Sequence, residues 1–488
     1  MPVLPFAEWV PDAAALGSPG MPNVINAKPG VNGYCPMPSH SALTDALDNY
    51  ARGAIDVRDA DLNVFQYAGD AAKLYVLSST AWTDRSKVGG YSTGTEEIWE
   101  FAHFNNKVLA TNWDDNIQSI AVGGTIFADL TTAFRARHIA VVHEHVVAAN
   151  TFDTTDNNVP HRVRTSAIGD ETDWTVSGAT GSIARDLRGG DIRRVVGGQF
   201  GVILTGTSTY RMDWEGAPAW FRIDETLPGY GTLSSGAVTR RGDVVYSMSD
   251  SGMIAIVNGT TVEEIGTKKV NDFVLNDLDD AYPYRISSVA DSNGYVFWAY
   301  PGPGNTAGQP NRILIYDRSS GKWGLLHQEM EMLWRAGGIG FTLEGLDAIS
   351  TSIDDLEVSL DSSQWKGGGA ALLAGFDATN KHGFFSGTPL SATFETKESE
   401  IHAGHRTRLN SFTPLVEGGT VTARIGSRNR QNDDVVYTPS LTQRASGRFT
   451  KRVNARFHRI ELTASGDWSN ALGVEINPQD AIRADARG

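Results

Sequence analysis

Residues 74–84, LYVLSSTAWTD, combine a short apolar strand, a turn and a tryptophan that opens the return strand. The same plan returns at Thr209–Phe221 and at Ile313–Trp323. Alternating apolar residues on either side of a tight turn predict a β-hairpin. Hairpins that recur every few dozen residues are typical of radial β repeats such as the propeller. The sequence therefore predicts an all-β fold with blades around a central axis.

Aromatic residues that close successive units fall at nearly regular spacing. Trp82, Phe127, Trp174 and Trp220 are 45, 47 and 46 residues apart. A four-stranded blade takes roughly 40–50 residues. If this spacing continues over residues 46–388, it favours a β-propeller of six blades, and seven blades are the alternative. A short helical insertion is predicted near 268–280, where apolar residues have helical spacing.

The first 45 residues predict an extended N-terminal arm. Prolines recur at short intervals there, and they exclude both a helix and an inner strand. The arm is nevertheless too apolar for a free linker, so we expect it to pack along a larger body or against a neighbouring subunit. The candidates for a subunit contact are Phe6, Trp9, Val24, Ile25 and Tyr34. Ser41–Tyr50 is predicted to form a short helix with Ser41 as its cap.

Residues 389–488 differ in texture from the residues before them. Their alternating segments are longer and lack the turn followed by tryptophan. This pattern predicts a separate C-terminal domain, an antiparallel β-sandwich.

The charge of the chain is unevenly placed. Its net charge is −15, yet the segment Arg406–Arg459 holds eleven basic residues and only three acidic ones. A basic end on an acidic body predicts contact with DNA or with an acidic partner, and alternate arginines on a strand could follow phosphates without reading bases. The alternative is a solvated face attracted to acidic residues of the same chain. The candidates are Arg406, Arg408, Arg424, Arg428, Arg430, Arg444, Arg448, Lys451 and Arg452.

No motif in the sequence marks a catalytic or cofactor site, so we expect no enzyme activity, no metal and no cofactor. His143 and His145 share one face of a predicted strand but lack a third ligand beside them, and packed histidines are the commoner outcome. The single cysteine, Cys35, excludes an internal disulfide. No apolar run approaches the roughly 18 residues of a membrane helix, and the first residues lack the pattern of a secretion signal. We therefore expect no membrane segment and no export.

Several short segments, in the same order along the chain, resemble the tail hub or nozzle proteins of short-tailed bacteriophages. None of them is a catalytic motif; each is a turn or packing signature. They are Pro5–Asp12, Gly33–Pro36, Ala167–Trp174, Gly190–Ile192, Tyr210–Met212, Phe341–Asp347 and Gly383–Gly387.

This resemblance implies a structural protein of the virion, assembled in the cytoplasm of a bacterial host. Such proteins have a propeller body and form a homo-oligomeric ring, usually a hexamer, below the head-to-tail adaptor. The ring encloses the channel through which phage DNA leaves, contacts that DNA without sequence specificity and helps to retain and then release the genome. Tail fibres or spikes attach around it. No catalytic residue can be transferred from the family.

Two other functions fit the sequence. One is a monomeric, kelch-like binding propeller that recognises a glycan or a peptide. The other is a propeller glycosidase, which needs clustered carboxylates at one mouth of the disc. For that reaction the candidates are Asp250, Glu263, Glu264 and Asp291.

Overall fold

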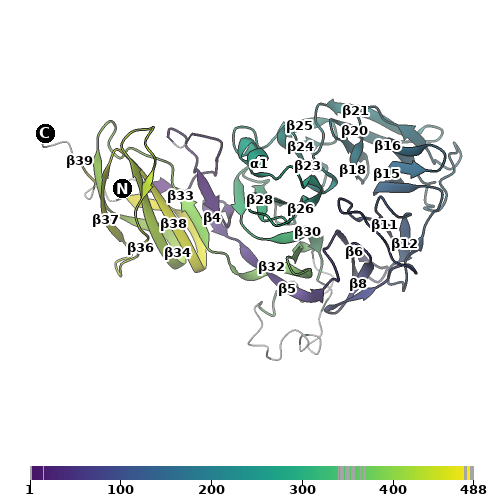
Figure 1. Ribbon diagram of the computed structural model, residues 1–488, viewed down its shortest axis with the longest axis horizontal. Helices are drawn as coiled ribbons and strands as arrows, with labels where there is room; N and C mark the ends of the chain where they lie inside the picture. The colour runs from purple at the N-terminus through teal and green to yellow at the C-terminus, as the bar shows by residue number, and fades with distance from the viewer. Residues whose placement is uncertain are drawn as a thin grey trace.

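The computed structural model describes residues 3–14, 16–338, 340, 346, 352, 358–362, 364–366, 370–476 and 481–483. The molecule has two parts, a disc of β-strands and an elongated lobe that projects from the rim of the disc (Figure 1). Both chain ends lie at the lobe. Of the segments that carry the family resemblance, Phe341–Asp347 lies outside the described residues except for Leu346.

Within the described residues, the disc consists of seven sets of four antiparallel strands. Six sets are separate sheets, and the set β26–β29 is continuous with the sheet of the lobe. The sets are β6–β9 (Gly53–Arg58, Val64–Gly69, Leu74–Ser78, Ala81–Asp84), β10–β13 (Glu100–Phe104, Lys107–Thr111, Gln118–Ala121, Ala128–Asp129), β14–β17 (Arg135–Val142, His145–Asp153, Asn157–Thr165, Ala184–Asp186), β18–β21 (Ile192–Val196, Gly201–Thr205, Ser208–Gly216, Trp220–Pro228), β22–β25 (Val238–Arg241, Val244–Ser249, Gly252–Val257, Thr261–Glu264), β26–β29 (Ser287–Ala290, Tyr295–Tyr300, Arg312–Asp317, Trp323–Leu326) and β30–β32 with β5 (Met330–Ala336, Leu372–Asp377, Lys381–Pro389, Pro38–Ala46).

The first strand of each set contacts the first strand of the next set, and β30 contacts β6, so the seven inner strands close a ring. The predicted β-propeller is thereby confirmed. The sequence favoured six blades and left seven possible. Six blades of the disc are separate four-stranded sheets, and a seventh set, β26–β29, belongs to the sheet that continues into the lobe.

The last blade is completed by the N-terminal segment β5, which pairs with β32. The helix predicted at Ser41–Tyr50 is therefore wrong. The open edge of β32 offers unpaired backbone groups, and a strand satisfies them where a helix would not. Tertiary pairing has overridden the local capping signal of Ser41.

The middle strands of the blades are buried on both faces. All five residues of β19 are buried, and β24 and β27 each have five buried residues of six. Both faces of a blade pack on neighbouring blades, so these strands read as continuous apolar runs. The three hairpins that open with an aromatic return strand are β8–β9, β20–β21 and β28–β29, the third and fourth strands of their blades.

Helix α1 (Asn271–Asp277) lies in the predicted insertion and buries Val274. Two single-turn 3-10 helices, η1 (Ser235–Ala237) and η2 (Pro283–Arg285), precede β22 and β26.

The lobe is built on two long antiparallel strands, β34 (Thr407–Arg428) and β38 (Phe457–Ile476). Their shorter neighbours are β33 (Ala392–Glu395), β35 (Val436–Tyr437), β36 (Leu441–Thr442), β37 (Phe449–Ala455) and β39 (Ala481–Arg483). The predicted all-β, antiparallel domain is present, but its strands form one curled sheet instead of two packed sheets. The pairing of β34 with β38 is irregular around Gly418 and Gly419, whose φ angles are 73° and 64°, and such irregularities bend long strands.

The N-terminal arm joins the lobe to the disc. Its strands are β1 (Val3–Pro5), β2 (Asn23–Ile25), β3 (Ala27–Gly30) and β4 (Gly33–Pro36). Strand β2 pairs on one side with β29 of the disc and on the other with β33 of the lobe, and β1 and β4 pair with β38. A single sheet therefore runs from the blade β26–β29 through the arm into the lobe.

The apolar side chains of the arm pack within their own chain. Phe6 stacks on Phe394 with ring centroids 5.0 Å apart, and the Tyr34 hydroxyl accepts a hydrogen bond from the Trp9 backbone N–H at 2.9 Å. Phe6, Trp9, Val24 and Tyr34 are buried and Ile25 is partly buried. Packing along the larger body, one of the two outcomes expected, is thus what the arm does; a contact with a neighbouring subunit stays a prediction.

Candidate functional site

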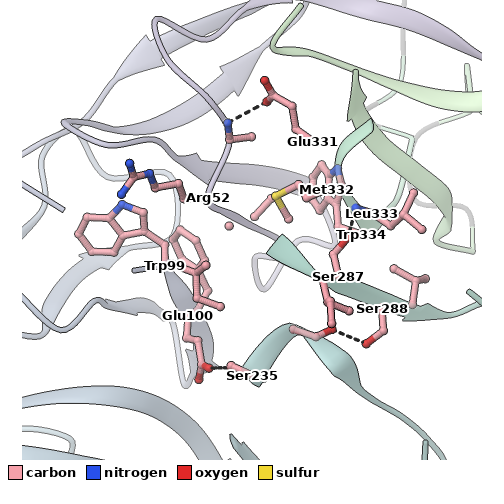
Figure 2. Close-up of a pocket in the computed structure, with 18 of the residues that line it drawn as sticks. Arg52, Trp99, Glu100, Ser235, Ser287, Ser288, Glu331, Met332, Leu333 and Trp334 are labelled. Atoms are coloured by element: carbon pink, nitrogen blue, oxygen red, sulfur yellow. Dashed lines mark hydrogen bonds between the residues drawn. The ribbon is translucent and has the colours of Figure 1, made fainter. Parts of the chain in front are cut away.

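The inner strands enclose a cavity of about 480 Å³ on the axis of the disc (Figure 2). Residues from β6, β10, β18, β22, β26 and β30 line it, together with the segments that lead into these strands. Its volume falls within the roughly 300–1,000 Å³ of small-molecule sites. The cavity is a candidate site because side chains from six blades converge on it.

One wall of the cavity carries a buried ionic cluster centred on Glu100 of β10. One carboxylate oxygen lies 2.8 Å from His138 Nδ1 and 2.8 Å from Arg194 Nη1, and it accepts a hydrogen bond from Ser235. The other oxygen accepts from the Ile139 backbone N–H at 3.3 Å. Four successive blades or their leading segments supply these groups, so the cluster ties neighbouring blades together.

Burial by itself would raise the pKa of Glu100. The charges of Arg194 and His138 and hydrogen bonds from His138 and Ser235 outweigh burial and lower the pKa to about 2. Glu100 is therefore ionised at neutral pH, and its charge is compensated inside the cluster.

A second wall holds two arginines, Arg52 before β6 and Arg285 at the end of η2. The Arg285 guanidinium lies over the Tyr50 ring, 3.8 Å from its centroid. The Nη1 of Arg52 donates to the carbonyls of Thr93, at 3.0 Å, and of Gly94. Both side chains thus approach the cavity without a carboxylate partner at hydrogen-bond distance among the described residues.

Glu331 of β30 lies nearby, and only 3% of it is exposed. One of its oxygens accepts the Ala51 backbone N–H at 2.8 Å (Figure 2). Burial raises the pKa of Glu331 to about 8, against the effect of that hydrogen bond and of the Arg285 charge, while Asp377 raises it further. This carboxyl is protonated at neutral pH.

A smaller cavity of about 260 Å³ adjoins the first and shares Glu97, Ser235 and Tyr284 with it. Arg137 lines it and forms an ion pair with Glu97 at 2.8 Å. The axial site is therefore a polar space with charged groups on several sides.

Sequence reasoning missed the axial site. Its charged residues lie between Arg52 and Arg335, at most two to a blade, so no local motif unites them. The one available signal was position: Glu100, Arg194 and Ser287 each stand at or near the start of a first strand, where the chain reaches the axis.

The predicted basic face is only partly free. Arg424 forms a two-pronged contact with Glu461, at 2.8 and 2.7 Å, and Arg428 pairs with Glu398 through its Nε at 2.6 Å and through a second nitrogen. These two arginines therefore follow the alternative expectation, in which the basic residues pair with acidic residues of the same chain. The acidic partners lie outside or at the edge of the basic segment, which is why the charge count overlooked them.

The other seven candidates are exposed and form no ion pair with any described residue. Arg408 on β34 and Arg452 on β37 lie close together, because Arg408 pairs with Asn454, two residues from Arg452. Strand β37 lies at the end of the lobe farthest from the disc (Figure 1). The seven residues are Arg406, Arg408, Arg430, Arg444, Arg448, Lys451 and Arg452, which we call the basic tip.

The four acidic residues of the glycosidase hypothesis do not come together. Asp250 lies in the turn between the second and third strands of its blade, and Asp291 follows the first strand of the next blade. Successive turns of an antiparallel blade alternate between the two faces of the disc, so these residues lie on opposite faces. Glu263 and Glu264 are on β25, an outermost strand.

The two histidines pack as the sequence suggested. His143 stacks on Trp214, with ring centroids 4.3 Å apart, and His145 is buried against Phe221. Among the described residues, no group of three or more His, Cys, Asp or Glu side chains is placed to hold a metal ion. No helix in the described part of the chain has the length and apolar content to cross a membrane.

No protein-family model matches the chain, and no curated protein matches it significantly. Matches among solved structures include the extracellular domain of a one-component system of B. thetaiotaomicron, at 10% identity and a TM-score of 0.41. That match covers 90% of this chain, which spans 62% of the domain's length.

Two further matches are the Neurospora crassa Pan2 WD40 domain (6% identity, 60% of this chain and 88% of that one, TM-score 0.38) and YCF48 bound to D1 peptide (11% identity, 60% and 91%, TM-score 0.34). Likenesses at this level carry no argument about function. The chain's own strand order defines its class, a β-propeller joined through an N-terminal arm to a curled β-sheet lobe.

Proposed function

We propose that this protein is a structural component of a virion, a tail hub or nozzle subunit of a short-tailed bacteriophage. In this proposal it has no catalytic activity and assembles in the cytoplasm of a bacterial host. It forms a ring, a hexamer by the family resemblance, below the head-to-tail adaptor, with fibres or spikes attached around it. The genome passes through the ring.

The observation that carries the proposal is the continuous sheet from the disc into the lobe. Two domains of one chain are usually joined by a flexible linker and move relative to each other. Here β2 pairs with β29 and with β33, and the arm also pairs with β38. A subunit whose disc and lobe share one sheet can hold two contact surfaces at a set spacing, as a ring below an adaptor requires.

The basic tip supports a contact with DNA or with an acidic partner. Its exposed cations are not compensated within the described chain, whereas the chain as a whole is acidic, at −15. Such a surface would bind phosphates without sequence preference and with strong salt dependence. An acidic body would repel DNA and let it slide past.

Assembly is tested on the full chain by light scattering and by negative-stain imaging, alone and with tail-less particles of the matching phage. We expect closed rings, or incorporation into the particles at the site of the tail. A protein that stays monomeric under both conditions and never joins a particle would overturn the proposal.

The contact of the basic tip is tested by a triple change, Arg408→Gln, Lys451→Gln and Arg452→Gln. If all three contact phosphates, the slope of log affinity against log salt falls by about 2–3. The matched control, Arg424→Gln with Arg456→Gln, removes arginines already paired with Glu461 and Glu400 and should change that slope by less. Unchanged DNA binding and unchanged assembly in the triple variant would exclude a contact at the tip.

The second candidate is a binding propeller that acts as a monomer, and the axial cavity is the observation that favours it. Light scattering separates it from the ring. The glycosidase alternative has no support from the positions of its four acidic residues.

A further inference from the structure

The axial cavity is lined by two guanidinium groups, those of Arg52 and Arg285, that form no ion pair with any of the described residues. Arg285 makes no ion pair with any of them, although it lines the cavity and stacks on Tyr50. Its Nε is shielded from solvent and has no hydrogen-bond partner in the described part of the chain. A guanidinium group in such a place usually has an acceptor.

Arg52 shares this condition. Its Nη1 donates to backbone carbonyls, which carry no net charge, and its Nε is also shielded and lacks a partner among the described residues. Burial and the neighbouring charge of Arg285 lower the pKa of Arg52. The two guanidinium groups therefore lie close enough to repel each other.

Among the described residues, no carboxylate forms an ion pair with Arg52 or Arg285; Asp70, Asp114 and Glu97 act on Arg52 only from a distance and partly oppose the lowering of its pKa. Glu331 is protonated at neutral pH because burial raises its pKa to about 8. The Glu100 carboxylate is engaged by Arg194 and His138, and Glu97 by Arg137. Asp56, the remaining acid of the lining, accepts the Gly337 backbone N–H and acts on Arg335. The wall of the cavity thus holds two guanidinium groups to which no described carboxylate is directly bonded.

We propose that the axial cavity binds a small molecule bearing a carboxylate or a phosphate, held by the guanidinium groups of Arg52 and Arg285. Planar guanidinium groups bind the paired oxygens of such anions with two parallel hydrogen bonds. The anion supplies the charged partner that the two guanidinium groups lack among the described residues, and the protonated Glu331 carboxyl is a further donor nearby.

The rest of the cavity fits the organic part of such a ligand. Figure 2 places Trp99 beside Arg52 on one side of the space and Met332 on the other. A volume of about 480 Å³ exceeds the needs of a bare inorganic anion and leaves room for an attached apolar or hydroxylated group.

The site is tested by calorimetric titration of the full chain with two probes, inorganic phosphate and succinate. We expect saturable binding of at least one of them at millimolar concentration. Binding of phosphate alone identifies a phosphate ligand, and binding of succinate alone identifies a carboxylate ligand. If neither probe binds, the proposal is overturned.

The decisive variant is Arg285→Gln, which should weaken binding about tenfold or more, because it removes a charge-assisted hydrogen bond. Its matched control is Arg185→Gln, the same loss of charge at an exposed position of β17, the outermost strand of its blade, which should leave the affinity within about twofold. An equal loss in both variants would reveal a non-specific effect of net charge and would overturn the proposal.

If Arg285→Gln does not fold, as judged by circular dichroism, the Arg285→Lys variant tests the site instead. Lysine keeps the positive charge but lacks the planar guanidinium group that donates two parallel hydrogen bonds, so binding should still weaken. Unchanged affinity in a folded Arg285→Lys variant would overturn the site. Either result leaves the ring proposal intact, since that proposal depends on assembly and not on this cavity.

Discussion

In the disc, the Glu100 carboxylate is fully buried and bridges side chains from several blades, whereas in the lobe the Arg424–Glu461 pair lies at the surface of one sheet. The two contacts look alike in distance. They differ in the free-energy cost of losing one partner. Water can hydrogen-bond to the group that remains at the surface, but it cannot reach the group that remains buried. The comparison teaches that buried charged groups stabilise the disc, whereas exposed charged groups of the lobe are available for contacts with other molecules.

Loss of the Glu100 carboxylate should have the largest effect. We expect Glu100→Ala to lower the free energy of unfolding by about 3 kcal/mol, because the buried His138 loses its hydrogen-bond acceptor and the partly exposed Arg194 loses its counter-charge. Urea denaturation measures it. Glu96, an exposed neighbour, provides the control, and Glu96→Ala should stay within about 0.5 kcal/mol of the wild type.

The cost of Glu100→Ala should depend on pH. The folded-state pKa of about 2 lies below the ordinary value of 4.5, so the stabilisation is complete above 4.5 and is lost as pH falls towards 2. The difference between variant and wild type should therefore shrink below pH 4.5 by up to roughly 3 kcal/mol. A difference that stays constant over this range would show that the carboxylate charge does not carry the effect.

The joint between the two regions should be nearly as sensitive. Trp9 is buried between the helix α1 and the arm, with its ring 5.3 Å from that of Phe273. We expect Trp9→Ala to cost about 3 kcal/mol, at the lower end for a buried tryptophan because the strand pairings of the arm remain. Val31→Ala is the control, since Val31 is 92% exposed.

Limited proteolysis of the same two variants tests the rigid joint directly. Cleavage within residues 5–30 should accelerate in Trp9→Ala and not in Val31→Ala. Equal rates in the two variants would mean that Trp9 does not hold the arm in place.

The disc was predictable from the sequence and the joint was not, for a physical reason. Each blade repeats one local pattern, an apolar hairpin with an aromatic residue on the return strand, and Trp82, Trp220 and Trp323 all occupy that position. Strand β5 and strand β2 pair with segments more than 290 residues away, and nothing local records such a partner.

The candidate sites divide in the same way. The basic tip could be predicted from a charge count. The count could not distinguish Arg408, which has no ion pair among the described residues, from Arg424, whose partner Glu461 lies beyond the counted segment. The axial site could not be read at all. Its members meet only because seven first strands share an axis, which is a property of the closed ring.

A third prediction concerns Glu331, the protonated acid of the disc. Its folded pKa of about 8 lies above the ordinary 4.5, so stability falls as pH rises from 4.5 through 8, since the folded state must give up a proton that it holds more tightly. Asp377, Arg285 and Tyr50 are the ionisable groups that face it. Glu331→Gln keeps the acceptor for the Ala51 N–H and cannot ionise, so it should match the wild type at pH 4 and exceed its stability by about 2 kcal/mol at pH 6, with a gap that keeps growing up to pH 8. Equal stability at both pH values would mean that Glu331 ionises freely.

The smallest effect should be that of the surface ion pair in the lobe. It tests whether the strength of an ion pair depends on the part of the molecule in which it lies or on its burial. Arg424 is 46% exposed, and a double-mutant cycle with Glu461 should give a coupling below about 1 kcal/mol. The neighbouring Arg428–Glu398 pair belongs to the same sheet, but the Glu398 side chain is only 1% exposed, so its cycle should give a clearly larger coupling. If both cycles gave the same small value, the lobe as a whole would tolerate the loss of its ion pairs. If Arg424 and Glu461 coupled as strongly as the buried pair, exposure would not govern these contacts, and the contrast between the disc and the lobe would fail.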